Sequence, residues 1–161
     1  MENSASSSVR TYNLTHRVGI LAPAKKVVQT LSTIDGLAAW WTRDTTGTSK
    51  VGGVIDFVFK QPSGEILGAM SMEVTHINPK QVIWRCVSGP PEWINTDIVF
   101  DITREAPYTI VMFSHQHWTE PTEFMAHCNM KWGTFLMSLK NLLETGQGRP
   151  SPDDVKIDSW N

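Results

Sequence analysis

Apolar residues recur at steps of three and four between residues 121 and 145, which is the pattern of one face of an α-helix. Six residues make this stripe: Phe124, Cys128, Trp132, Phe135, Leu139 and Leu142. Thr119 is placed to cap the start of the helix, and Gly146 is placed to end it. At about 1.5 Å per residue such a helix is roughly 36 Å long. Most of the preceding chain must therefore cover its apolar face.

From residue 51 to residue 118 the apolar period changes to two, which indicates β-strands. Apolar residues alternate with polar or small ones over five segments: 55–59, 70–75, 82–86, 98–102 and 108–118. Turn residues such as Pro62-Ser63-Gly64 and Asn78-Pro79 separate consecutive segments. Short connections of this kind predict an antiparallel meander with one buried face.

The residues before this meander predict a strand and two short helices. The strand covers 11–21, one helix begins at Pro23, the second covers 33–41, and residues 44–47 form a turn after it. A sheet and a helix with one apolar face each must cover one another, so the predicted fold class is α+β. We expect one domain over residues 11–148 and a flexible tail over 1–10. A second tail, 149–161, either packs on the domain or is disordered.

Composition and charge exclude several classes of function. A chain of 161 residues with 40% hydrophobic and 19% charged residues suits one globular domain. A net charge of −2 gives no reason to expect nucleic-acid binding. No apolar run is long enough for a membrane span, and residues 1–10 lack the apolar core of a signal peptide. Cys86 and Cys128 lie in apolar patterns and are expected to be reduced core thiols, so we expect a cytoplasmic protein.

Several local strings, taken in their order and spacing, carry a resemblance to a known family. They are Leu37-Ala38-Ala39-Trp40-Trp41-Thr42, then Val51-Gly52-Gly53 before Phe57 and Phe59, then Ile77-Asn78-Pro79 before Val82 and Trp84, then His115, and finally Trp132, Leu139-Lys140 and Gly146-x-Gly148-x-Pro150. Residues 12–150 thereby resemble the SRPBCC superfamily, which has the START or Bet v 1-like helix-grip fold. The similarity is to the branch named after the activator of Hsp90 ATPase. The resemblance implies a curved antiparallel sheet of six or seven strands around the long C-terminal helix, with a hydrophobic cavity between them.

Fifteen residues are candidates for lining that cavity. Most are wide, polarisable side chains on the inward faces of the strands and the long helix. The candidates are Trp40, Trp41, Phe57, Phe59, Met70, Met72, Trp84, Trp93, Phe100, Phe113, His115, Phe124, Cys128, Trp132 and Phe135. Periodicity alone is more typical of residues that simply fill a core, and it is the family resemblance that favours the pocket. In that fold Trp40, Trp41 and Trp93 lie near the cavity mouth, where they either contact a ligand or hold the loops on the core.

The histidines suggest two kinds of chemistry. His115 and His117 are expected on one face of a strand, and His127 and Cys128 on the facing helix. Adjacent helical positions point about 100° apart, so His127 and Cys128 do not easily share one ion, and we expect no metal and no cofactor. His115 either contacts a ligand, acts as a general base, or is satisfied by neighbouring hydrogen-bond partners.

Three functions follow as hypotheses. The favoured one is binding of a hydrophobic, lipid-like or aromatic small molecule in the cavity, without catalysis. The second, drawn from enzymes in the superfamily, is a polyketide cyclase or hydratase in which His115 is the acid or base and Arg43 or Arg85 is an oxyanion partner. The third is an Hsp90 co-chaperone-like interaction, which is disfavoured because only a ten-residue polar tail stands where the named co-chaperone has a separate N-terminal domain. The oligomeric state stays open between monomer and homodimer.

Overall fold

The structure, a computed structural model, describes residues 9–161. Seven strands form one antiparallel sheet in the order β1-β7-β6-β5-β4-β3-β2. The strands are β1 (Tyr12–Ile20), β2 (Asp44–Gly47), β3 (Val54–Lys60), β4 (Ile66–Asn78), β5 (Gln81–Ser88), β6 (Asp97–Glu105) and β7 (Tyr108–Trp118). The predicted α+β fold with a meander of consecutive strands is confirmed. Residues 1–8 of the expected flexible tail lie outside the described residues.

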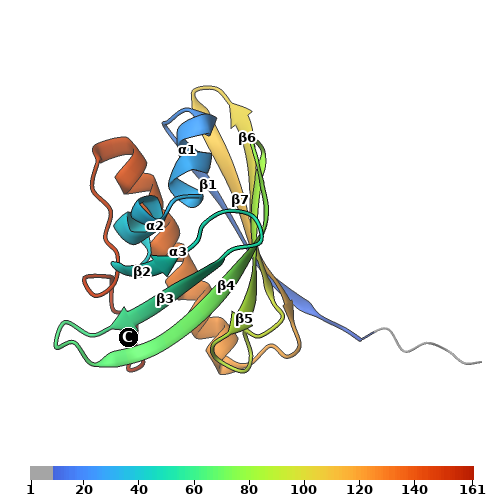
Figure 1. Ribbon diagram of the computed structural model, residues 1–161, viewed down its shortest axis with the longest axis vertical. Coiled ribbons are helices and arrows are strands. Elements are labelled where there is room, and N and C mark those ends of the chain that lie inside the picture. The colour runs from blue at the N-terminus through green and yellow to red at the C-terminus, as the bar shows by residue number, and fades with distance from the viewer. Residues whose placement is uncertain (1–8) are drawn as a thin grey trace, which may run out of the picture.

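Three helices complete the fold: α1 (Ala24–Leu31), α2 (Ile34–Trp40) and α3 (Glu123–Thr145). Figure 1 shows α3 running along the inner side of the curved sheet, with α1 and α2 beside its C-terminal half. Gly146 ends α3 with a left-handed backbone, as predicted. Within residues 9–161, no helix combines the length and the apolar character that a membrane span requires.

Three local expectations are wrong. The N-cap of α3 is Thr122, whose hydroxyl accepts a hydrogen bond from the Met125 N–H, so the helix starts later than a cap at Thr119 implied. Residues 44–47 form strand β2 in place of a turn, because Thr45 and Thr46 pair with Phe57 and Asp56 of β3. Both threonines are β-branched and suit a strand, although the flanking Asp and Gly are turn residues.

The third correction concerns the end of β7. His117 has a positive φ of 74°, and the pairing of β7 with β1 shifts register there, which marks a β-bulge. The bulge breaks the alternation of side chains, so His115 is buried while His117 is exposed. Trp118 takes the next buried position. The two histidines therefore do not share a face.

The core lies between the inner face of the sheet and the inner stripe of α3. Residues predicted to face inward on β3, β5, β6 and β7 are fully buried, among them Phe57, Trp84, Phe100 and Phe113. Trp41, at the end of α2, joins these strands to the helix, because its ring stacks on Trp84 at 5.7 Å and on Trp132 at 5.0 Å. Aromatic pairs at such distances add to the stabilisation that burial gives.

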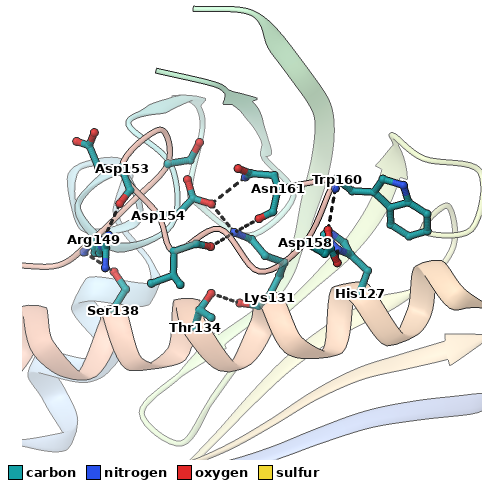
Figure 2. Close-up of polar contacts among 12 residues, drawn as sticks. His127, Lys131, Thr134, Ser138, Arg149, Asp153, Asp154, Asp158, Trp160 and Asn161 are labelled. Atoms are coloured by element: carbon teal, nitrogen blue, oxygen red, sulfur yellow. Dashed lines mark hydrogen bonds and ion pairs between the residues drawn. The ribbon is translucent and has the colours of Figure 1, made fainter. Parts of the chain in front are cut away.

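Residues 149–161, which we call the strap, pack on the domain. Ser151 pairs with Thr42 in an isolated bridge, so the strap starts beside the end of α2. From there it runs along α3 toward the β3–β4 hairpin, as Figure 2 shows. Lys131 of α3 forms an ion pair with Asp154, and both side chains are buried. The sequence left open whether this segment packs or is disordered, and in the structure it packs.

Candidate ligand-binding site

A pocket of about 310 Å³ opens between the β3–β4 hairpin, α3 and the end of the strap. Its wall also includes Trp41 after α2 and the loop before β6. The lining residues are Trp41, Phe59, Leu67, Gly68, Met70, Pro90, Trp93, Phe124, His127, Cys128, Lys131, Trp132, Phe135, Trp160 and Asn161. Most of them are apolar or aromatic, as is usual for sites that bind small organic molecules.

Three tryptophans on three different segments form an aromatic wall of the pocket. Trp132 of α3 stacks on Trp41 at 5.0 Å on one side and on Trp93 at 6.0 Å on the other. Behind them, the pocket is backed by the packed rings of the core, since Trp41 also contacts Phe57 at 4.4 Å. The space behind the aromatic wall is therefore filled by side chains, and the pocket lies on its other side, toward the β3–β4 hairpin and the strap.

The β3–β4 hairpin forms the opposite wall. Phe59 and Gly68 are directly paired across the two strands, so they point to the same face of the sheet. The Phe59 ring packs edge-on against Phe135 at 6.0 Å, which places that face toward α3. A Cβ atom at Gly68 would meet no atom within 4 Å. The missing side chain at this position leaves the hairpin wall open.

Polar groups lie where α3 meets the strap (Figure 2). The Lys131 ammonium donates to the Asp154 carboxylate at 2.5 Å, to the Val155 carbonyl at 2.7 Å and to the Asn161 carbonyl at 3.2 Å. All three ammonium protons are thereby used. One turn earlier on α3, His127 pairs with Asp158 of the strap.

Cys128 is the remaining titratable group that lines the pocket. Burial is the main cause that raises the pKa of its thiol, to about 12. The thiol is therefore protonated at neutral pH and is a poor nucleophile. Cys86, which lies in the core on β5, behaves similarly, because burial raises its pKa to about 11. Both cysteines are free and buried, in agreement with the prediction of core thiols.

The structure brings eight of the fifteen candidate residues together around the pocket. They are Trp41, Phe59, Met70, Trp93, Phe124, Cys128, Trp132 and Phe135. The other seven are not among the residues that line it, and each is buried in the core: Trp40, Phe57, Met72, Trp84, Phe100, Phe113 and His115. Five of the seven lie beside a tryptophan of the pocket wall: Trp40, Phe57 and Trp84 beside Trp41, and Phe113 and His115 beside Trp132. A binding role for any of the fifteen stays a prediction.

His115 is the one polar side chain among the seven candidates that lie in the core. Its ring is fully buried and hydrogen-bonded on both sides: Trp132 Nε1 donates to Nδ1 at 3.1 Å, and Nε2 lies 2.8 Å from the Thr96 hydroxyl. Burial lowers the pKa of His115 from 6.5 to about 3. Such a ring is a satisfied, neutral core histidine, and the arrangement gives no support to an acid–base role.

The two arginines suggested as oxyanion partners of His115 are not at the pocket either. Arg43 forms an ion pair with Asp153, and Arg85 forms one with Asp97; neither lines the pocket. Among residues 9–161, no three His, Cys, Asp or Glu side chains converge in a way that could hold a metal ion.

The periodic pattern did not single out seven of the lining residues: Leu67, Gly68, Pro90, His127, Lys131, Trp160 and Asn161. Leu67 and Gly68 precede the alternating part of their strand, and Trp160 and Asn161 belong to a segment without any period. The one available signal was an aromatic residue, Trp160, in an otherwise polar tail.

The strand order, the long C-terminal helix and the pocket between this helix and the sheet define a protein of the helix-grip class. Among solved structures, the chain is similar to the Aha1 dimer from Colwellia psychrerythraea. The identity is 41%, the match covers 85% of this chain and 99% of that one, and the TM-score is 0.73. At this identity and coverage, the chain belongs to the Aha1 family.

Two further structures share the fold at lower identity. DynU16, a protein from the dynemicin biosynthetic locus, has 19% identity and a TM-score of 0.69, and the match covers 84% of this chain but 48% of DynU16. A protein from Mesorhizobium loti has 19% identity and a TM-score of 0.67, with 82% and 96% of the two chains covered. No protein-family model and no curated protein matches the chain.

Proposed function

We propose that this member of the Aha1 family binds an apolar, aromatic small molecule in the pocket between the β3–β4 hairpin, α3 and the strap. The observation that carries the proposal is the aromatic lining of an open pocket of about 310 Å³. Sites for small organic molecules usually measure about 300–1,000 Å³, so the pocket suits a compact ligand of one or two fused rings. The packed rings behind the wall provide a preformed surface for it.

Filling the pocket at Gly68 tests the proposal. A Gly68→Phe ring has space to enter, because a Cβ atom there meets nothing within 4 Å and points to the same side as Phe59. We use 2-naphthol as the probe and measure its Kd by calorimetry. The variant should weaken binding at least tenfold, because the new ring occupies the space of the ligand. Ile66→Phe is the matched control, since Ile66 lies on the same strand, is 62% exposed and does not line the pocket.

Native mass spectrometry of the protein purified from its own host detects a natural ligand by its mass. We expect an adduct on the unaltered protein and on Ile66→Phe that is missing from Gly68→Phe. Equal binding of 2-naphthol to all three proteins would contradict the proposal, because the occupied site would then lie elsewhere.

Membership in the Aha1 family favours a second candidate function, the Hsp90 co-chaperone-like interaction that the sequence resemblance implies. An increase in the ATP turnover of purified Hsp90 on addition of the chain would support it, and unchanged turnover at saturating concentration would rule it out. Because the related Colwellia protein is a dimer, we also propose that this chain forms a homodimer. Sedimentation velocity distinguishes that state from the monomer.

A further inference from the structure

His127 is held at the edge of the pocket by three neighbours. Its ring stacks on Phe124 of the preceding turn, with centroids 6.3 Å apart and planes 13° apart. Trp160 of the strap packs edge-on against the ring at 5.4 Å. Asp158 Oδ2 lies 2.6 Å from Nδ1. The His127 side chain is 12% exposed, and with two aromatic neighbours and one nitrogen paired its ring has a fixed orientation.

The pairing with Asp158 decides which nitrogen carries the proton. The hydrogen bond from His127 is the main cause that lowers the pKa of Asp158, so this carboxyl group is ionised at neutral pH and can only accept. Nδ1 is therefore the protonated nitrogen, and Nε2 of the neutral ring presents a lone pair.

The free nitrogen is available to a ligand. Nε2 makes no hydrogen bond to the described residues and is not among their buried unpaired atoms. His127 lies between the pocket and a second hollow and lines both, whereas Asp158 lines the second hollow alone. Nδ1 is directed at Asp158, so Nε2 is the ring nitrogen left for a molecule in the pocket.

The other titratable groups of the lining are already committed. Lys131 uses its three protons on Asp154, Val155 and Asn161, and the Cys128 thiol is protonated and buried. Of the titratable residues that line the pocket, His127 alone offers a free polar atom to a bound molecule.

We infer that His127, positioned by Asp158, binds a hydroxyl group on the aromatic ligand, an inference that rests on the proposed function. A hydroxyl both donates and accepts, so it can pair with Nε2 in either protonation state of the ring. A carboxylate is less suited, because the nearby Asp158 carboxylate repels a second negative charge. The chemical class is therefore a phenol or another hydroxylated ring compound.

The test compares two probes of equal shape, 2-naphthol and 2-methylnaphthalene, which differ in the hydroxyl group. Kd values are measured by calorimetry with the protein in the syringe, and the quantity compared is the ratio of the two Kd values. His127→Phe keeps the aromatic contacts and removes Nε2, so the ratio should shift about tenfold in favour of 2-methylnaphthalene. His76→Phe is the matched control, because His76 is exposed on β4 and does not line the pocket.

Asp158→Asn tests the positioning role without altering His127. An amide can donate to Nδ1 and move the ring proton to Nε2, so the ratio should shift in the same direction by a smaller factor. A change in packing alone would weaken both probes together and leave the ratio unaltered. Circular dichroism confirms that each variant is folded.

The outcomes separate this inference from the proposed function. If both probes bind and the ratio is the same in the unaltered protein and in His127→Phe, the hydroxyl contact is wrong and the pocket stands. If 2-naphthoate binds more tightly than 2-naphthol, the site selects an anion and the hydroxyl class is overturned. If neither aromatic probe binds to the unaltered protein, both proposals fail.

Discussion

His115 shows at the scale of one residue how a buried polar group can be structural. The geometry defines a directional chain of hydrogen bonds: Trp132 donates to Nδ1, so Nε2 carries the proton and donates to the Thr96 hydroxyl, which donates to the Trp93 carbonyl at 2.5 Å. Both nitrogens of the His115 ring therefore have a partner. This series of hydrogen bonds joins β7 to α3 and to the loop before β6, and the latter two contribute residues to the pocket wall.

We predict that this residue makes the protein sensitive to mild acid. The pKa of His115 falls from 6.5 to about 3 on folding, because burial disfavours the charged ring. Between these values the unfolded state binds the proton and the folded state does not, so stability rises with pH and is lost as pH falls below 6.5. The slope is about 1.4 kcal/mol per pH unit, so the free energy of unfolding should drop by about 2 kcal/mol between pH 7 and pH 5.

Urea denaturation at the two pH values measures this drop. His115→Gln should be less stable at pH 7, because a buried hydrogen-bond partner is lost, but its stability should change much less on going to pH 5. His76→Gln, which alters an exposed histidine, should retain the drop. A pH dependence in His115→Gln equal to that of the unaltered protein would show that other groups are responsible.

At the scale of one element, the start of α3 depends on Thr122. Its hydroxyl accepts from the Met125 N–H at 3.2 Å and donates to the Glu92 carboxylate at 2.6 Å. Thr122→Ala should reduce the free energy of unfolding by about 1 kcal/mol, the usual cost of losing an N-cap. Thr119→Ala, in the exposed residue that the sequence pattern favoured as the cap, should leave stability nearly unchanged. Urea denaturation of both variants decides which threonine caps the helix, and equal effects would contradict the assignment.

The buried pair of Lys131 and Asp154 is one of the contacts that attach the strap to the domain. Removal of one partner leaves a buried charge without compensation, so Asp154→Ala should cost about 3–5 kcal/mol. The double variant Lys131→Met with Asp154→Leu should recover most of that loss, because apolar side chains replace both charges. Asp153→Ala is the matched control: its pair with Arg43 is more than half exposed on both sides and should contribute about 0–1 kcal/mol. The free energies come from urea denaturation of the unaltered protein and the three variants, and a double variant as unstable as Asp154→Ala would contradict the coupling.

Elements with a clear period could be predicted from the sequence, and those fixed by distant contacts could not. The stripe on α3 and the alternation on β3, β5, β6 and β7 gave the fold class and most of the aromatic wall. The bulge at His117 and the pairing of β2 with β3 arise from contacts across the sheet, which no local pattern reports. Asp158 reaches His127, and Asp154 reaches Lys131, from a segment whose own sequence has no period. The polar contacts at this end of the site could therefore not be predicted from the sequence pattern.

At the scale of the whole molecule, the pocket joins parts of the chain that are far apart in sequence. Gly68 lies on the β3–β4 hairpin, Trp132 on α3 and Trp160 on the strap, and each forms one wall. A molecule bound there contacts all three at once. Unfolding of the chain separates these walls, so the proposed ligand should bind the folded state and not the unfolded one.

Binding should therefore raise the melting temperature in a way that depends on the pocket. At a free concentration of 2-naphthol a hundredfold above its Kd, the folded state gains about 2.7 kcal/mol. For a domain of this size that gain corresponds to a rise in Tm of about 5–10 °C, measured by differential scanning calorimetry. Gly68→Phe, tested at the same concentration, should show a much smaller rise, while Ile66→Phe should match the unaltered protein. An equal rise in Gly68→Phe would mean that the probe stabilises the protein through another surface, and the three walls would then not form its site.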